Sequence, residues 1–166
     1  AYSKQDIVQS LAYSTAEVLT YPMETWEIVL HAFTAINDSV ITHYQASLQN
    51  YQESLPNNVS TLFDDCVNNN VDVAIMLNSG LFTASQFHGA EVSVQTIVQA
   101  GATIEYVSTG YSKQDIVDSL AFSTADVLVY PMEAWEVVQL AYANGPETAT
   151  AMFYKNDLKD IQEATT

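Results

Sequence analysis

Apolar residues recur at helical spacing along most of the chain, and polar residues typical of helix starts precede them. Ser3 and Asp6 have the spacing of a capping box, in which a hydroxyl and a carboxylate satisfy free amide groups of the first turn. Ser14 repeats this start signal, which leaves open a short break or a continued helix. The apolar residues between the two signals are Ile7, Val8, Leu11 and Ala12.

Longer apolar stripes follow on both sides of a central segment. Pro22 suits the first turn of a new helix. Two long helices are expected at about residues 39–55, capped by Asp38, and at about 147–163, after the pair Gly145-Pro146. The stripe that follows Pro22 consists of Met23, Trp26, Val29, Phe33 and Ile36.

The central segment, residues 58–110, predicts shorter elements. Ser60 is the expected cap of a helix through Leu62, Phe63 and Cys66, and a second helix is expected at residues 71–77. A third is expected to begin at Thr83 or Ser85 and to run to about Gly101, and residues 102–110 are expected to form a connector. These patterns predict an all-α fold, a compact orthogonal bundle of about six to eight short helices.

The chain contains an internal repeat. Residues 2–33 and 111–142 are identical at 23 of 32 aligned positions, at a constant offset of 109. A fainter echo with one inserted residue pairs Tyr44, Leu48, Gln52 and Glu53 with Tyr154, Leu158, Gln162 and Glu163.

This repeat sets the expected domain organisation. Residues 1–110 are interpreted as one complete tandem repeat, a helical module, and residues 111–166 as the first half of the next repeat, packing with it as one globule. We expect the chain to be a piece of a longer tandem array, with a single recent duplication as the alternative.

The charge of the chain is strongly negative. Four lysines and no arginine against 20 acidic residues give a formal net charge of −16, yet only 14% of residues are charged, which is typical of a folded acidic protein. Without a basic patch, nucleic acid is not an expected partner. A membrane is not expected either, because an anionic surface would repel the chain and no apolar run approaches the roughly 20 residues of a span.

No catalytic, cofactor-binding or metal-binding residues are identified. His31, His43 and His88 are the only imidazoles, and none has a paired spacing typical of metal ligands. Gly-rich phosphate loops and a GxSxG motif are missing from the sequence. The chain is therefore expected not to be an enzyme and to use no cofactor.

Two carboxylate pairs at a spacing of three residues leave three interpretations open: Glu24 with Glu27, and Glu133 with Glu136. Repulsion could raise a carboxyl pKa for acid–base chemistry. The interpretation that we favour is a solvated helix face near a positive helix start. In the third, acidification weakens the repulsion between acidic surfaces and triggers assembly.

Three further side chains admit a structural and a functional interpretation. Trp26 and Trp135, with Met23 and Met132 beside them, are interpreted as core and not as an aromatic ligand pocket. Cys66, the single cysteine, is interpreted as a small buried apolar residue and not as a reactive thiol. A disulfide between chains is the alternative for Cys66.

The segment from Ala74 to Gln86, followed by Val92 to Ala100, resembles the helical domains of spider silk proteins. There, an apolar helix ends in a small residue plus glycine, as at Ser79-Gly80, and an apolar residue, a polar capping pair and a further helix follow. The scarcity of Lys and Arg, the abundance of Ser, Ala, Gln and Asn, and the homogenised repeat are also similar. The chain departs from that family in its many Tyr and acidic residues and in lacking poly-Ala and Gly-rich blocks.

The resemblance implies a secreted, extracellular structural protein. Its expected function is that of a helical module in a repetitive silk-like fibre or glue protein, which is stored in soluble form and then assembles by self-association with other copies of the repeat. The alternative is an extracellular helical binding module, with an apolar pocket lined by Met23, Trp26 and Phe33 that takes a lipid or another small ligand.

Overall fold

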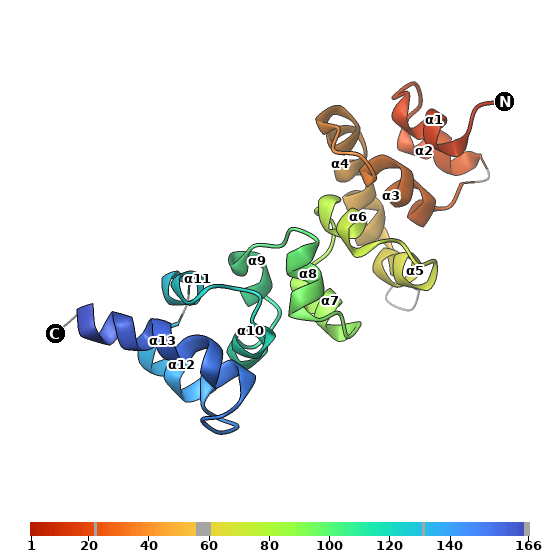
Figure 1. Ribbon diagram of the computed structural model, residues 1–166. Coiled ribbons are helices and arrows are strands. Elements are labelled where there is room, and N and C mark those ends of the chain that lie inside the picture. The colour runs from red at the N-terminus through yellow and green to blue at the C-terminus, as the bar shows by residue number, and fades with distance from the viewer. Residues whose placement is uncertain (22, 56–60, 131, 165–166) are drawn as a thin grey trace. The chain divides into compact units, whose positions relative to one another are not determined.

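A computed structural model describes residues 1–21, 23–55, 61–130 and 132–164 of the chain. Over these residues it contains thirteen helices and no strand, which confirms the all-α prediction (Figure 1). The helices divide between two compact units, unit 1 (Ala1–Phe82) and unit 2 (Thr83–Thr166). Each sequence copy, 2–33 or 111–142, therefore lies within one unit.

Unit 1 contains six described helices. The helix α3 is central, because α1, α4, α5 and α6 all pack against it. The bounds are α1 (Lys4–Gln9), α2 (Thr15–Thr20), α3 (Thr25–Phe33), α4 (Asp38–Ser54), α5 (Leu62–Asn68) and α6 (Val73–Asn78).

Unit 2 contains seven described helices. The helix α10 packs against α8, α9 and α12, and α13 packs against α11 and α12. The bounds are α7 (Ala84–Gly89), α8 (Val94–Gln99), α9 (Ile104–Ser108), α10 (Lys113–Ser119), α11 (Thr124–Val129), α12 (Ala134–Ala141) and α13 (Ala149–Ala164).

Capping side chains explain where many of the helices begin. The Ser3 and Ser14 hydroxyls accept hydrogen bonds from the amides of Asp6 and Glu17, and the two carboxylates in turn accept hydrogen bonds from the serine amides. Ser14 therefore starts a new helix, and Leu11, at φ 57°, ends the preceding turn in the left-handed region. The second copy repeats both capping boxes at Ser112 and Ser123.

Two expectations for the central segment are wrong. The single helix expected up to Gly101 is two helices, α7 and α8, because Glu91 takes a left-handed φ of 60° and the Val92 amide donates back to the Phe87 carbonyl. The expected connector at 102–110 contains α9, whose first turn is capped by the Thr103 hydroxyl.

Smaller differences concern the caps. The long helix α4 is capped by the Asn37 side chain and not by Asp38, which is its first residue. The Thr61 hydroxyl caps α5, and Ser60, the expected cap, lies outside the described residues, as does Pro22.

The two units have equivalent cores where the repeat copies fold. Val8, Ile28 and Tyr44 are fully buried in unit 1, and their counterparts Val117, Val137 and Tyr154 are fully buried in unit 2. The helix pairs α1–α3 and α2–α4 of unit 1 correspond to α10–α12 and α11–α13 of unit 2. The fainter echo along α4 and α13 is therefore matched by equivalent packing.

Candidate interaction surfaces

The carboxylate pairs lie at the starts of α3 and α12, where they bind backbone and side-chain donors. The Glu27 carboxylate accepts hydrogen bonds from the Glu24 amide, at 2.8 Å, and from the Lys4 ammonium, at 2.5 Å. Burial disfavours the charged form of Glu27, but the bonds from Lys4 and Glu24 outweigh it, so its pKa lies below the usual value. The acid–base interpretation required the opposite direction.

The second copy repeats this arrangement. The Glu136 carboxylate accepts from the Lys113 ammonium at 2.5 Å and from the Glu133 amide at 2.9 Å. These bonds, with the bond from Lys113 the larger cause, lower the pKa of Glu136. The indole N–H of Trp135 donates to Glu133 at 2.6 Å, as that of Trp26 donates to Glu24. In both copies the second carboxylate of the pair thus links the first turn of its helix to a lysine on the neighbouring helix, α1 or α10.

The three histidines lie in separate places. Burial lowers the pKa of His31 on α3, and the Nε2 atom of His43 lies 3.0 Å from the Tyr13 carbonyl oxygen. Among the described residues no group of three or more His, Cys, Asp or Glu side chains is arranged to hold a metal ion.

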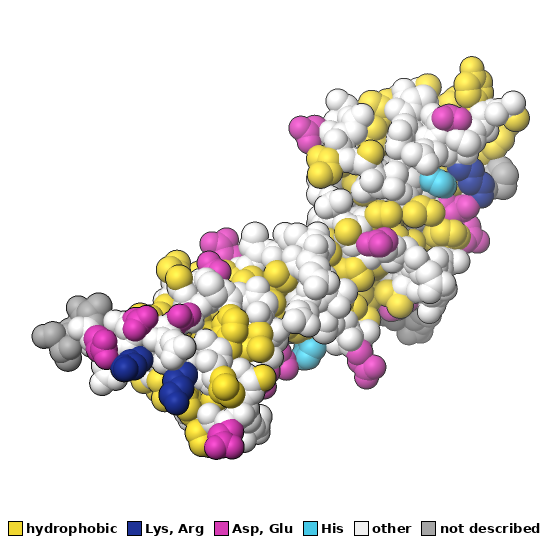
Figure 2. All heavy atoms as spheres, in the orientation of Figure 1, with side chains coloured by type: hydrophobic (Ala, Val, Ile, Leu, Met, Phe, Trp, Pro, Cys, Tyr) yellow, Lys and Arg dark blue, Asp and Glu magenta, His cyan; other side chains and the backbone are white. Residues whose placement is uncertain are grey.

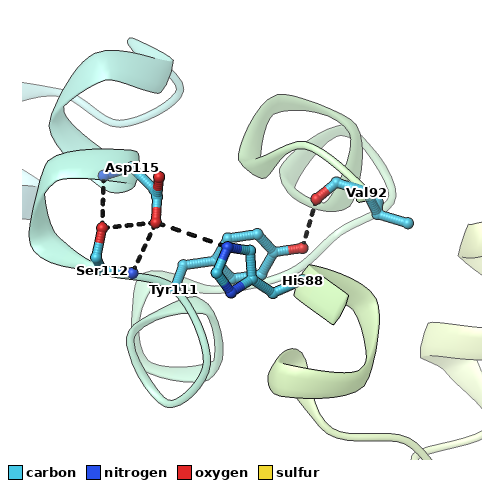
Figure 3. A network of polar contacts seen from close by, with 5 residues as sticks. All are labelled: His88, Val92, Tyr111, Ser112 and Asp115. Atoms are coloured by element: carbon cyan, nitrogen blue, oxygen red, sulfur yellow. Dashed lines mark hydrogen bonds and ion pairs between the residues drawn. The ribbon is translucent and has the colours of Figure 1, made fainter. Parts of the chain in front are cut away.

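His88 belongs to a polar cluster that joins α7 to the start of α10 (Figure 3). Its ring lies 4.9 Å from that of Tyr111, and its Nε2 atom is 3.9 Å from an Asp115 carboxylate oxygen. The Tyr111 hydroxyl donates to the Val92 carbonyl at 2.7 Å, and the Ser112 hydroxyl donates to Asp115 at 2.6 Å. The cluster therefore fixes the loop before α8 against the first turn of α10.

Most of the side chains interpreted as core are buried, but that interpretation is wrong for Trp135, which is 61% exposed. Met23 and Phe33 are buried in unit 1, and Met132 is buried in unit 2, while Trp26 is half-buried. Cys66 is buried and free, and burial, with a smaller contribution from the Asp65 charge, raises its pKa to about 12. A thiol in this state is a poor nucleophile.

Unit 2 carries an apolar groove of about 580 Å³ between α12 and α13. We call it the α12–α13 groove. Trp135 is 61% exposed there and Val138 is 46% exposed, although both lie on the apolar stripe of α12. The groove is lined by Ala134, Trp135, Val138, Lys155, Leu158 and Lys159.

Unit 1 carries a second apolar groove, of about 610 Å³, along α1 and α2. We call it the α1–α2 groove; its larger lining residues are Tyr2, Ile7, Tyr13 and Tyr21. Tyr2 is 86% exposed, whereas Tyr111, its counterpart in unit 2, is only 6% exposed.

Each groove corresponds to a covered surface on the other copy. In unit 1 the counterpart of Val138 is the fully buried Val29 on α3, a helix that packs against α5 and α6 as well as against α1 and α4. In unit 2 the counterpart of Ile7 is the buried Ile116, on α10, which packs against α8 and α9. Each of the two apolar faces is thus covered in one copy of the repeat and exposed in the other.

Neither groove could be identified from the sequence. The residues that line each groove are identical or similar to the residues that form the covered face of the other copy. One signal was available in the fainter part of the repeat. Lys155 and Lys159 stand where α4 has Gln45 and Gln49, so positive charge appears along only one of the two equivalent helix pairs.

Acidic side chains outnumber basic ones in the chain, with 20 Asp and Glu against four lysines. On the face shown in Figure 2, acidic side chains are scattered over both units, and hydrophobic side chains reach the surface between them. None of the described helices combines the length and the apolar character that crossing a bilayer requires.

The chain matches no known protein family, no curated protein and no solved structure.

Proposed function

We propose that this chain is a structural module of a repetitive, secreted, silk-like protein that is stored in soluble form and assembles by self-association. The observation that carries the proposal is the near identity of the two copies at surface positions as well as in the core. Ser3, Lys4 and Asp6 recur as Ser112, Lys113 and Asp115. An ordinary duplicated fold needs to share only its core pattern, so retained surface residues support homogenisation among tandem copies.

The exposed apolar grooves support self-association. Apolar patches of this kind are typical of protein interaction surfaces. The charge of −16 keeps concentrated copies apart at neutral pH by mutual repulsion. Protonation of carboxylates weakens that repulsion, so acidification is the trigger of assembly in this proposal.

The proposal extends to the architecture. We propose that the helices form a compact orthogonal bundle and that the chain is part of a longer tandem array. The thirteen described helices are more than the six to eight expected from the sequence, and they divide between two units. The support is that the helices of each unit contact several others of the same unit.

The test is the association state of the full chain as pH falls from 8 to 5, with and without shear. Light scattering should report monomer at pH 8 and growing assemblies toward pH 5, while circular dichroism follows the helices. Raised salt at pH 8 is the matched control, because it screens the same repulsion without changing protonation and should also promote association. A chain that stays monomeric and unchanged under acid, salt and shear would contradict the proposal.

The second candidate function is the binding of a lipid or another small apolar ligand outside the cell. The α1–α2 groove favours it, because its volume of about 610 Å³ falls within the range of small-molecule sites and its walls are largely tyrosine and aliphatic. Met23 and Phe33, two of the expected lining residues, are buried in the core. Native mass spectrometry of the purified chain tests this candidate, which requires a co-purifying lipid.

A further inference from the structure

We propose that the α12–α13 groove is the binding site for a helix pair equivalent to α5–α6, supplied by a further copy of the repeat. The proposal rests on the proposed function in that it needs such a copy. It goes further in naming which helices of the neighbour bind, and where.

The first argument is that unit 1 already shows this interaction. There α5 and α6 both pack against α3, the counterpart of α12. Thr25 and Val29 on α3 are buried, whereas their counterparts Ala134 and Val138 are exposed. Among the described helices, α12 packs against α10 and α13, the counterparts of α1 and α4, and against no counterpart of α5 or α6. We therefore attribute the cover over Thr25 and Val29 to α5–α6.

The partner helix of the groove shows the same difference. Leu48 on α4 is fully buried, and its counterpart on α13, Leu158, is half-buried at the groove. Trp26 is half-buried and Trp135 is exposed. The open face thus exposes apolar side chains on both helices, and covering it removes apolar surface from water.

A specific polar contact also has a counterpart. In unit 1 the Gln45 side chain donates to the Ser79 carbonyl oxygen at the end of α6, at 2.9 Å. Lys155 occupies the Gln45 position in unit 2 and lines the groove. Its ammonium is a donor too, so it can bind the last carbonyl groups of an α6-like helix, where a positive charge is favourable.

The charges of the groove and of the segment are complementary. Two of the four lysines of the chain, Lys155 and Lys159, line the α12–α13 groove. Residues 61–82, which contain α5 and α6, have no lysine and carry Asp64, Asp65 and Asp72. The opposite charges of the groove and the segment attract each other. The apolar residues of α5 and α6 distinguish this segment from acidic surfaces that have no apolar residues.

The α1–α2 groove does not carry the same inference. In unit 2 the helix α7 approaches the chain closely at Gly110, just before α10, where a Cβ atom would overlap the backbone of Ala84 and Ser85. The residue at this position in the first copy is Ala1. Its Cβ would obstruct the same approach of an α7-like helix.

The experiment extends the full chain by residues 55–82, joined after Ala164, so that α5 and α6 follow α13 at the spacing at which they follow α4. Trp26→Phe leaves Trp135 as the only tryptophan. In dilute solution at pH 8, the emission of Trp135 should shift to shorter wavelength, its quenching by acrylamide should fall, and helical circular dichroism should increase.

The matched control is the same extension with Leu62→Asp and Met76→Asp in the added segment, since both side chains are buried in unit 1. It should leave Trp135 as exposed as in the unextended chain. Burial of Trp135 in a monomer or in a concentration-dependent dimer supports the proposal, because in either case the added helices fill the groove. Unchanged Trp135 emission with the native extension would overturn it.

Variants of Lys155 separate specific docking from general collapse. In the extended chain, Lys155→Gln restores the residue of unit 1 and should keep the shift in Trp135 emission, whereas Lys155→Glu should reduce it. Equal emission in both variants would contradict the role given to Lys155. None of these readouts requires acid- or shear-driven assembly, so failure of the proposed function and failure of this proposal are distinguishable.

Discussion

The Tyr44 hydroxyl donates a hydrogen bond of 3.0 Å to the Val8 carbonyl oxygen, between two fully buried residues of unit 1. Its counterpart in unit 2, Tyr154, is equally buried, but its hydroxyl has no hydrogen-bond partner among the described residues. Burial raises the pKa of both phenols, that of Tyr154 to about 12 with a smaller contribution from Asp118. Equivalent tyrosines therefore have different roles in the two units.

Tyr44→Phe should lower the free energy of unfolding of unit 1 by about 1–2 kcal/mol, because it leaves a buried carbonyl without its donor. Tyr154→Phe should be neutral or slightly stabilising, because it removes a buried polar atom that is unpaired. Urea unfolding followed by circular dichroism measures both, with Trp26 and Trp135 emission assigning the transition to unit 1 or unit 2. Equal losses in the two variants would contradict the assignment.

Gly110 marks a close approach of backbone to backbone in unit 2. A Cβ there would overlap the backbone of Ala84 and Ser85 and lie 2.8 Å from the Ala84 Cβ. Gly110→Ala should therefore destabilise unit 2 by at least about 2 kcal/mol, since backbone atoms cannot yield as side chains can. Thermal unfolding of the full chain measures the effect.

Gly89→Ala is the matched control for Gly110→Ala. No atom lies within 4 Å of its Cβ position, and Gly89 is the last residue of α7. The substitution should be neutral or stabilise by about 0.4–1 kcal/mol through the unfolded chain. A loss similar to that of Gly110→Ala would show that contact with α7 is not the cause.

Much of the helical order could be predicted because the capping signals are local. The serines at the starts of α1, α2, α10 and α11 act through atoms within three residues of themselves, so their pattern is sufficient. The break between α7 and α8 could not be predicted from glycine, because a glutamate, Glu91, takes the left-handed conformation. The signal that was available is Ser93, whose hydroxyl caps α8.

The grooves could not be predicted from the residues that line them. Tyr2 and Tyr111 begin identical seven-residue stretches, yet one is exposed and the other is buried. Tyr111 lies against His88 on α7 and donates to the Val92 carbonyl before α8, and both of these segments lie outside the repeat. Coverage of an apolar face depends on distant segments, which local periodicity does not record.

Cys66 should react slowly in the native state. Its thiol is buried and its pKa is raised to about 12, so little thiolate is present at pH 8 and access is blocked. We expect a disulfide exchange reagent to modify it rapidly in urea and far more slowly without urea. Rapid labelling of the folded chain, or recovery of a disulfide-linked dimer from non-reducing electrophoresis, would contradict this.

His31 should make unit 1 less stable as pH falls below 6.5. Burial lowers its pKa in the folded chain, with Glu27 opposing the shift and Lys4 adding to it. The unfolded chain therefore binds a proton at His31 more readily than the folded chain does. The contribution of neutral His31 to the free energy of unfolding is complete above the ordinary pKa of about 6.5, and it is lost as pH falls through the lower pKa of the folded chain.

The carboxylates with lowered pKa values act in a lower window. Hydrogen bonds from Ser3 hold the pKa of Asp6 down, and those from Ser14 hold that of Glu17 down. Their stabilisation is present above their unfolded values and is lost as pH falls below about 4.5. The interval between pH 6.5 and 5 therefore isolates histidine titration.

His31→Leu gives the first copy the residue of the second, where Leu140 stands. In urea unfolding of the full chain at pH 7.5, 6.5, 5.5 and 5, the native chain should lose stability over the last three values, and the variant should lose less. His43 and His88 remain in both chains, so the difference between the two profiles belongs to His31. Parallel profiles would mean that acid sensitivity in this range arises elsewhere, and that an acid-responsive unit 1 does not depend on this side chain.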